Sequence, residues 1–314
     1  MSSQDKIKKL KLIFMGTPEF SLPGLQKLIN DDSFEIVGIF TQTDKPIGRK
    51  QILTPPPVKV LALKHKLQVF QPEKIKTEIE NIKNLQPDLI VVIAYGKIIP
   101  QEILDIPVYG CINVHASLLP KYRGAACLNA PILNGDLETG ITIMKMEAGL
   151  DTGPILRQSK MELTGTESLA DVHDTLSNLG AAILPETLHD WVNKKIEPQI
   201  QDDSQASYIK TLSKEDGKIN WGKSAIEIER MVRAYNPWPG TWTDINGEIL
   251  KIITVEHEIV ESKKMKIGKL SLEDGRLIIQ CGQNALAILK LQLAGKKIMS
   301  AEEFINGHKS KINN

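Results

Sequence analysis

The segment from residue 110 to 153 contains the residue types that acid–base chemistry needs. Asn113 and His115 are two positions apart in an apolar run, so on a β-strand their side chains point to the same face. An amide can donate a hydrogen bond to a developing oxyanion, and an imidazole can move a proton or share that charge. Because the turn Ser117–Pro120 follows, we expect both at the carboxyl end of a strand, where open α/β sheets bind ligands. A backbone-capping asparagine and a core histidine are the alternative for this pair.

Asp151 adds a carboxylate to this pair. It lies in the glycine-flanked stretch Gly149–Gly153, after the next predicted strand. A carboxylate there can orient His115 and stabilise its charged form, although an aspartate in such a turn is more often only a turn residue. The nucleophile-elbow pattern G-x-S-x-G does not occur in the sequence. Direct attack of an amine on an activated acyl donor is therefore favoured over a covalent acyl-enzyme.

Short apolar strands alternate with helical stretches through the first 190 or so residues. The predicted strands are Lys11–Met15, Glu35–Thr41, Gln68–Phe70, Leu89–Ala94, Gly110–Val114 and Ile141–Met146, with a polar loop after the second. The predicted helices are Leu22–Asn30, Val58–Lys66, Ile75–Leu85 and Leu169–Lys194. This alternation predicts an α/β fold with a Rossmann-like, doubly wound, mostly parallel sheet.

A second domain follows a polar, proline-containing stretch. That stretch predicts a linker at residues 196–208 between domains at 1–195 and 209–314. After it come a helix at Ser224–Tyr235 and five short strands between turn signals, at Thr241–Ile245, Ile249–His257, Gly268–Ser271, Leu277–Gln280 and Leu286–Gln292. This pattern predicts a small antiparallel β-barrel of OB type, with a small sandwich as the alternative.

The chain has 314 residues, of which 41% are hydrophobic and 25% charged, a composition typical of a globular protein that folds without disulfides or metal ions. The net charge is only +1. Residues 1–204 hold 22 Lys and Arg against 25 Asp and Glu, a net charge of −3, whereas residues 205–314 hold 17 against 13, a net charge of +4. The basic second part fits a nucleic-acid partner, and a solvated surface fits the same excess.

The apolar runs and the cysteines of the sequence argue against a membrane protein and against a metal-binding protein. No apolar run approaches the roughly 18–20 residues that a membrane span needs. The three cysteines, Cys111, Cys127 and Cys281, form no CxxC pair and no spacing typical of a metal site. An odd, sparse set of thiols fits a reducing compartment. We therefore expect a cytoplasmic chain with no metal and no membrane contact.

Six motifs, in order, extend over nearly the whole chain. They are FMGTPEF at 14–20, the loop at 41–59, NVHASLLPKYRGAA at 113–126, GDLETGITIMKMEAGLDTG at 135–153, TLSKEDGKINW at 211–221 and RAYNPWPGTW at 233–242. Together they resemble the methionyl-tRNA formyltransferase family. The resemblance implies transfer of a formyl group from 10-formyltetrahydrofolate, a co-substrate, to the α-amino group of methionine on initiator tRNA. It also implies a formyltransferase fold with an OB-like tRNA-binding domain, metal-independent chemistry and a monomer.

The resemblance assigns roles to matching residues. The family's catalytic asparagine, histidine and aspartate match Asn113, His115 and Asp151. Its folate-contacting segment matches Ser117, Leu118, Leu119 and Pro120. Its tRNA-engaging loop matches residues 44–50, where Arg49 corresponds to the arginine placed against the acceptor end and Lys45 and Lys50 add charge; a solvated loop is the alternative for these three cations.

The chain departs from the family pattern at four places, and two rival functions stay open. Thr43 replaces a usual proline, and Tyr122 replaces a usual tryptophan. Lys50 replaces a usual glycine, and Cys127–Pro131 replaces a usual Pro-Ile-Gln-Arg run, in which Pro131 is compatible with a helix only in its first turn. Sugar-nucleotide N-formyltransferases use the same folate donor and a similar N-x-H-x-S-L-L-P motif. A tRNA-binding module without catalysis is the rival of another class. The turn after the first strand lacks G-x-G-x-x-G, which argues against a dinucleotide dehydrogenase.

Overall fold

The computed structural model describes residues 9–48, 50–245, 247–261, 266–308 and 312. Within these residues the chain divides into two compact units. The first comprises residues 9–124, 139–161 and 173–208, and the second comprises residues 125–138, 162–172 and 209 onwards. The second unit therefore includes two short segments that precede residue 173 in the chain.

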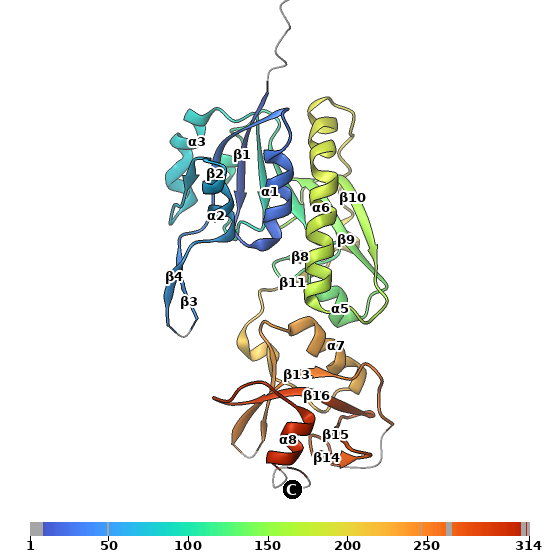
Figure 1. Ribbon diagram of the computed structural model, residues 1–314. Helices are drawn as coiled ribbons and strands as arrows, with labels where there is room; N and C mark the ends of the chain where they lie inside the picture. Colours follow the sequence, from blue (N-terminus) through green and yellow to red (C-terminus); the bar gives the residue numbers. More distant parts are fainter. Residues whose placement is uncertain (1–8, 49, 246, 262–265, 309–311, 313–314) are drawn as a thin grey trace, which may run out of the picture. The chain divides into compact units, whose positions relative to one another are not determined.

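The first unit is built on a seven-stranded, mostly parallel sheet (Figure 1). Its strands, in spatial order, are β10 (Ile155–Glu162), β9 (Glu138–Lys145), β7 (Cys111–His115), β6 (Leu89–Ile93), β1 (Leu10–Gly16), β2 (Phe34–Phe40) and β5 (Val69–Phe70). The pairings from β7 to β5 are parallel, and β9 runs antiparallel to β7. The predicted Rossmann-like, mostly parallel sheet is confirmed, and the sequence patterns missed β10.

Helices cover both faces of this sheet, so it is doubly wound. The helix α6 (Leu169–Val192) packs on β7 and β9, because a Cβ at Gly180 would lie 3.0 Å from Val114 Cγ1. On the other face, Ile82 of α3 (Ile79–Leu85) and Ile103 of α4 (Gln101–Leu104) share a buried cluster with Met15 of β1. The helices α1 (Leu22–Ile29) and α2 (Pro57–Lys64) and the 3-10 turns η1 (Glu19–Ser21) and η2 (Ile75–Glu78) complete this part of the unit.

The loops that leave the carboxyl ends of the parallel strands bind one another. Thr17 Oγ1, after β1, and Gln42 Nε2, after β2, both donate to the carbonyl oxygen of Tyr95, after β6, at 3.0 and 3.1 Å. Ser21 Oγ donates to the carbonyl oxygen of Ile93 at 2.6 Å. These bonds hold together the loops at the carboxyl ends of the parallel strands, and β7, which is parallel to β6, ends on the same side of the sheet.

A two-stranded hairpin occupies part of the predicted polar loop. Its strands are β3 (Lys45–Ile47) and β4 (Ile52–Thr54), which pair antiparallel. The sequence patterns missed it because each strand has only three residues and β3 contains Pro46, which is unfavourable within a sheet.

The second unit contains an antiparallel sheet and three helices. The strands are β12 (Thr241–Ile245), β13 (Glu248–Val255), β16 (Ala285–Leu293), β15 (Arg276–Gln280) and β14 (Leu270–Glu273) in spatial order, with β17 (Met299–Ser300) also paired to β16. The helices are α5 (Ala130–Asn134), α7 (Ala225–Tyr235) and α8 (Ala301–Gly307), with the 3-10 turn η4 (Lys214–Gly217) before α7. The five predicted strands and the α7 prediction are confirmed, whereas β17 and α8 were missed. Among the described strands no pairing joins β12 to β14, so an OB-like barrel stays a prediction.

Local signals explain the helix starts in this unit. Ser224 and Glu227 form a capping box at the first turn of α7. The segment Cys127–Pro131 differs from the family pattern, and its Pro131 lies in the first turn of α5, where no backbone N–H is needed.

No helix in the described part of the chain combines the length and the apolar character that a bilayer crossing requires.

Candidate active site

Strand β7 presents Asn113 and His115 on one face. Side chains alternate along a strand, and Val114, between them, faces Gly180 of α6. Asn113 and His115 therefore project from the face opposite to α6, as their spacing predicts. Asn113 is half-buried, and His115 is only 6% exposed.

The two ring nitrogens of His115 face different groups. The Nε2 atom lies 3.0 Å from the carbonyl oxygen of Tyr122. Because a carbonyl can only accept, Nε2 carries a hydrogen and donates. The Nδ1 atom faces the carboxylate of Asp151, with 3.6 Å between Nδ1 and Oδ2. The ring nitrogen next to the Asp151 carboxylate is therefore Nδ1.

The turn at residues 149–153 places the Asp151 carboxylate. Asp151 has a φ of +54°, and its Oδ2 accepts a hydrogen bond from the backbone N–H of Gly124 at 2.8 Å. The turn lies tightly against β9, because a Cβ at Gly153 would overlap the carbonyl oxygen of Lys145. The glycine is thus required for close approach, and the structure brings Asp151 next to His115 from a different loop.

The segment Ser117–Pro120 is tied to neighbouring strands. The hydroxyl of Thr142 on β9 donates to the carbonyl oxygen of Ser117 at 2.7 Å and accepts from the N–H of Leu119 at 3.0 Å. Gln158 on β10 donates to the carbonyl oxygen of Leu119 at 2.9 Å. Ser117 and Leu119 are buried, whereas Leu118 and Pro120 are half-buried. Only the latter two side chains of this segment are accessible to a ligand.

Two of the three predicted tRNA-engaging cations, Lys45 and Lys50, belong to the β3–β4 hairpin and its turn. Lys45 and Lys50 are exposed, and Lys45 Nζ donates to Gln42 Oε1 at 2.8 Å. Arg49 lies outside the described residues. The hairpin also exposes apolar side chains, with Ile47 59% and Leu53 65% exposed. Cations next to exposed apolar groups on one hairpin fit a partner with phosphates and flat apolar surfaces.

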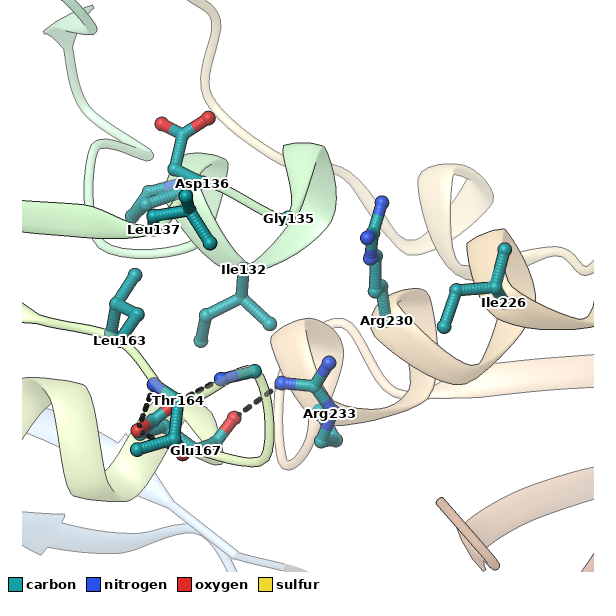
Figure 2. A pocket seen from close by; sticks show the side chains of 12 residues that line it. Ile132, Gly135, Asp136, Leu137, Leu163, Thr164, Glu167, Ile226, Arg230 and Arg233 are labelled. Carbon is teal, nitrogen blue, oxygen red and sulfur yellow. Dashed lines mark hydrogen bonds between the residues drawn. The ribbon is translucent and has the colours of Figure 1, made fainter. Parts of the chain in front are cut away.

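A pocket of about 270 Å³ lies elsewhere, within the second unit (Figure 2). It is bordered by α5, the residues 163–167 and α7. Arg233 of α7 donates to the carbonyl oxygen of Glu167 at 2.7 Å, and its guanidinium also forms an ion pair with the buried Glu229. Hydrogen bonds from Thr164 and Gly165 outweigh the effect of burial and lower the pKa of Glu167 to about 2. This pocket contains none of the predicted catalytic residues.

The thiols lie in apolar surroundings. Burial raises the pKa of Cys111, on β7, and of Cys281 to about 12. Cys127 is buried as well. No group of three or more His, Cys, Asp or Glu side chains that could bind a metal ion occurs in the described parts of the chain.

Two further buried polar residues are connected to the site, and the sequence patterns did not single them out. Gln201 Nε2 donates to the carbonyl oxygen of Asp151, and the side chain of Arg123 donates to Gln201 Oε1. Arg123 is 1% exposed and lies inside the NVHASLLPKYRGAA motif. Gln201 is 7% exposed, although it belongs to the stretch predicted as a linker. The motif could have drawn attention to Arg123, but polar composition around Gln201 gives no signal of burial.

Two protein-family models match the chain. The model described as formyl transferase matches residues 8–188, and the model described as formyl transferase, C-terminal domain, matches residues 211–309. A methionyl-tRNA formyltransferase of Trichlorobacter lovleyi is 46% identical over 308 residues, which cover 95% of this chain and 94% of that protein.

Solved structures share the fold at lower identity. The N-formyltransferase from Helicobacter canadensis, in complex with folinic acid and dTDP-3-aminofucose, has a TM-score of 0.66 at 20% identity and covers 89% of this chain and 99% of its own. HypX from Aquifex aeolicus, in complex with tetrahydrofolic acid, has a TM-score of 0.62 at 15% identity and covers 95% of this chain and 47% of its own. At these identities the likeness supports the fold alone.

Proposed function

Because this chain belongs to the methionyl-tRNA formyltransferase family, we propose that it transfers the formyl group of 10-formyltetrahydrofolate to the α-amino group of methionine on initiator tRNA. The observation that carries this proposal is the identity to the Trichlorobacter lovleyi enzyme along nearly the whole of both chains. The product primes translation initiation. We further propose a cytoplasmic, monomeric protein whose chemistry is independent of metal.

The proposed catalytic residues are Asn113, His115 and Asp151. The methionyl amine attacks the formyl carbon, a new C–N bond forms, and the bond from that carbon to N10 of the folate breaks. Asn113 donates a hydrogen bond to the developing oxyanion. His115 accepts the amine proton at Nδ1 and returns a proton to N10, while the carboxylate of Asp151, 3.6 Å away, stabilises the imidazolium.

Folate is proposed to bind along Ser117, Leu118, Leu119 and Pro120. The hydrogen bonds from Thr142 and Gln158 hold this segment rigid next to β7, which supports a preformed site. The side chains of Ser117 and Leu119 are buried, so these two residues fix the conformation of the segment. Leu118 and Pro120 contribute the apolar contacts to folate. The sheet edge at which β7 ends is the usual ligand crevice of such folds.

The proposed tRNA contacts are Lys45, Arg49 and Lys50 together with a C-terminal domain at residues 209–314. The exposed lysines of the hairpin fit phosphate contacts. Residues 205–314 have a net charge of +4, and their five-stranded antiparallel core supports an OB-like tRNA-binding role. We propose the boundary between the two domains at the polar stretch 196–208.

The rival functions receive less support. A sugar N-formyltransferase of the same fold is only 20% identical to this chain, against 46% for the methionyl-tRNA enzyme. A binding module without catalysis has no need for the His115–Asp151 pair.

The deciding experiment measures formyl transfer from 10-formyltetrahydrofolate to methionyl-initiator tRNA and, in parallel, to a nucleotide-linked amino sugar. We expect turnover with the tRNA and none with the sugar. Turnover with the sugar alone would move the assignment to the rival enzyme class, and turnover with neither would favour the binding module.

A further inference from the structure

We propose that Arg123 and Gln201 are positioning residues that hold both partners of His115 in place. This inference rests on the proposed formyl transfer. It concerns a pair of side chains, here named the Arg123–Gln201 clamp, whose two members are 78 positions apart in the chain and lie in the same unit. Neither touches His115 directly in the described contacts.

The amide of Gln201 joins two backbone segments. Its Nε2 donates to the carbonyl oxygens of Asp151 and Gly153, at 2.9 and 2.7 Å. Its Oε1 accepts from Nε and Nη2 of Arg123, at 3.1 and 2.8 Å. All the hydrogen-bonding capacity of this buried amide is thereby used. A side chain in such a position fixes the turn at Asp151 relative to Arg123.

Arg123 lies between the two backbone groups that contact the catalytic pair. The preceding residue, Tyr122, accepts the hydrogen bond from His115 Nε2, and the following residue, Gly124, donates to Asp151 Oδ2. The Arg123 side chain therefore anchors a tripeptide whose flanking groups determine the direction of the imidazole and the carboxylate.

Arg123 makes further hydrogen bonds to residues 203–208. Its guanidinium donates to Tyr208 Oη at 2.8 Å and to Asp203 Oδ1 at 2.7 Å. Its backbone N–H donates to the carbonyl oxygen of Ser207 at 2.8 Å, and Ser207 Oγ accepts from the N–H of Tyr122 at 2.9 Å. The stretch predicted as a linker therefore holds residues 122–124 in place through these hydrogen bonds.

The backbone on both sides of the clamp needs such support. Tyr122 and Asp151 have φ of +61° and +54°, in the left-handed region that side-chain-bearing residues rarely adopt. A local conformation of this kind persists only when the surrounding contacts impose it. Without the clamp we expect both turns to relax, and the distance from His115 Nδ1 to Asp151 Oδ2 to vary.

The test uses Gln201→Glu in the full-length chain. A glutamate keeps the size of the side chain and its acceptor for Arg123, but it cannot donate to the carbonyl oxygens of Asp151 and Gly153. We expect kcat for methionyl-tRNA to fall roughly 10- to 100-fold with KM for the tRNA changed little, because orientation is lost rather than binding. Gln205→Glu is the matched control, since it adds the same charge in the same stretch and Gln205 Nε2 bonds only Asp202 in the described contacts.

A double-mutant cycle separates positioning from a general loss of structure. If Gln201 acts through Asp151, Gln201→Glu should lower kcat of the Asp151→Asn variant by less than about twofold, because the two changes remove the same interaction. An equal fall in both backgrounds, or a wild-type kcat in Gln201→Glu, would overturn the inference. An inactive parent chain would instead reject the proposed function.

Arg123→Lys is the second variant, for the case that Gln201→Glu does not fold. A lysine keeps the charge near Asp203 but loses the planar fork that binds Gln201. The same kcat loss and the same non-additivity with Asp151→Asn are expected. Absence of a cooperative thermal transition in both variants would replace the positioning role by a structural one.

Discussion

His115 donates its Nε2 hydrogen to the backbone carbonyl of Tyr122 across 3.0 Å. This bond places the ring hydrogen on Nε2, because a carbonyl oxygen can only accept. Nδ1 faces the Asp151 carboxylate, 3.6 Å from its Oδ2. In the proposed reaction this nitrogen exchanges the proton, and the carboxylate stabilises the positive ring.

The first prediction concerns the oxyanion and proton-transfer groups. Asn113→Ala and His115→Ala should each lower kcat for methionyl-tRNA formylation by roughly 10²–10³, because each removes a group that acts in the transition state. Thermal unfolding should retain a single cooperative transition. A kcat near that of the parent chain in either variant would contradict the assignment.

The second prediction concerns the tight turn beside β9. Gly153→Ala should lower both stability and kcat, because its Cβ would overlap the Lys145 carbonyl and the turn that bears Asp151 must move. We expect a cost of about 1–3 kcal/mol in the free energy of unfolding, measured by urea titration. Gly307→Ala is the control, since among the described residues no atom outside the adjacent residues and the helix's own backbone lies within 4 Å of the Cβ position at Gly307. Equal stability of the two variants would argue against the close approach.

Long apolar patterns made the sheet of the first unit predictable. The strand β6 is buried at all five positions and reads as a continuous apolar run. The edge strand β10 alternates exposed and partly buried residues over most of its length, and Lys160 and Glu162 are among the exposed ones. It therefore contains no continuous apolar run from which a strand could be predicted. The hairpin β3–β4 is too short for any periodicity. Tertiary pairing, rather than local pattern, forms both of these elements.

The candidate site was predictable from the sequence only for those side chains whose type and spacing form a pattern. The two-residue spacing of Asn113 and His115 places them on one face, and the glycines around Asp151 indicate a turn. The partner of His115 Nε2 is a backbone carbonyl, which has no sequence signature. Gln201 also has no sequence signature, because its burial follows from contacts with residues 48 to 78 positions away. The polar composition and the proline of this stretch predicted a linker, and they carry no signal for the burial of the Gln201 amide.

The third prediction concerns alkaline pH. Burial raises the pKa of Cys111 to about 12, and the pKa of Tyr95 is likewise raised to about 12. A group whose pKa is raised by folding contributes stability that is complete below its unfolded pKa and is lost as pH rises towards the folded one. We expect the urea midpoint to fall between pH 9 and pH 11. Cys111→Ala should make that fall shallower, and an unchanged pH dependence would contradict the burial of the thiol.

The fourth prediction concerns a buried ion pair in α7. Glu229 is 2% exposed and pairs with Arg233 Nε at 2.6 Å, while the exposed His257 lies 2.7 Å from the same oxygen. Arg233→Met should cost about 3–5 kcal/mol of unfolding free energy, because it leaves a buried carboxylate with less compensation. The double variant Glu229→Gln/Arg233→Met should recover part of that loss in urea titrations. Additive losses would show that the two side chains are not coupled.

The last prediction concerns the hairpin β3–β4 and tRNA binding. Lys45→Ala and Lys50→Ala should each weaken tRNA binding and reduce the slope of log affinity against log salt by about 1, because each lysine that contacts a phosphate releases about one counterion. Arg49→Ala should do the same. Lys83→Ala is the control, because Lys83 is an exposed lysine of α3 that pairs with Glu80 and lies outside the hairpin. Affinity measured over a salt series decides the matter: if the hairpin variants and the control share one slope, the hairpin cations are solvated side chains and tRNA binds elsewhere.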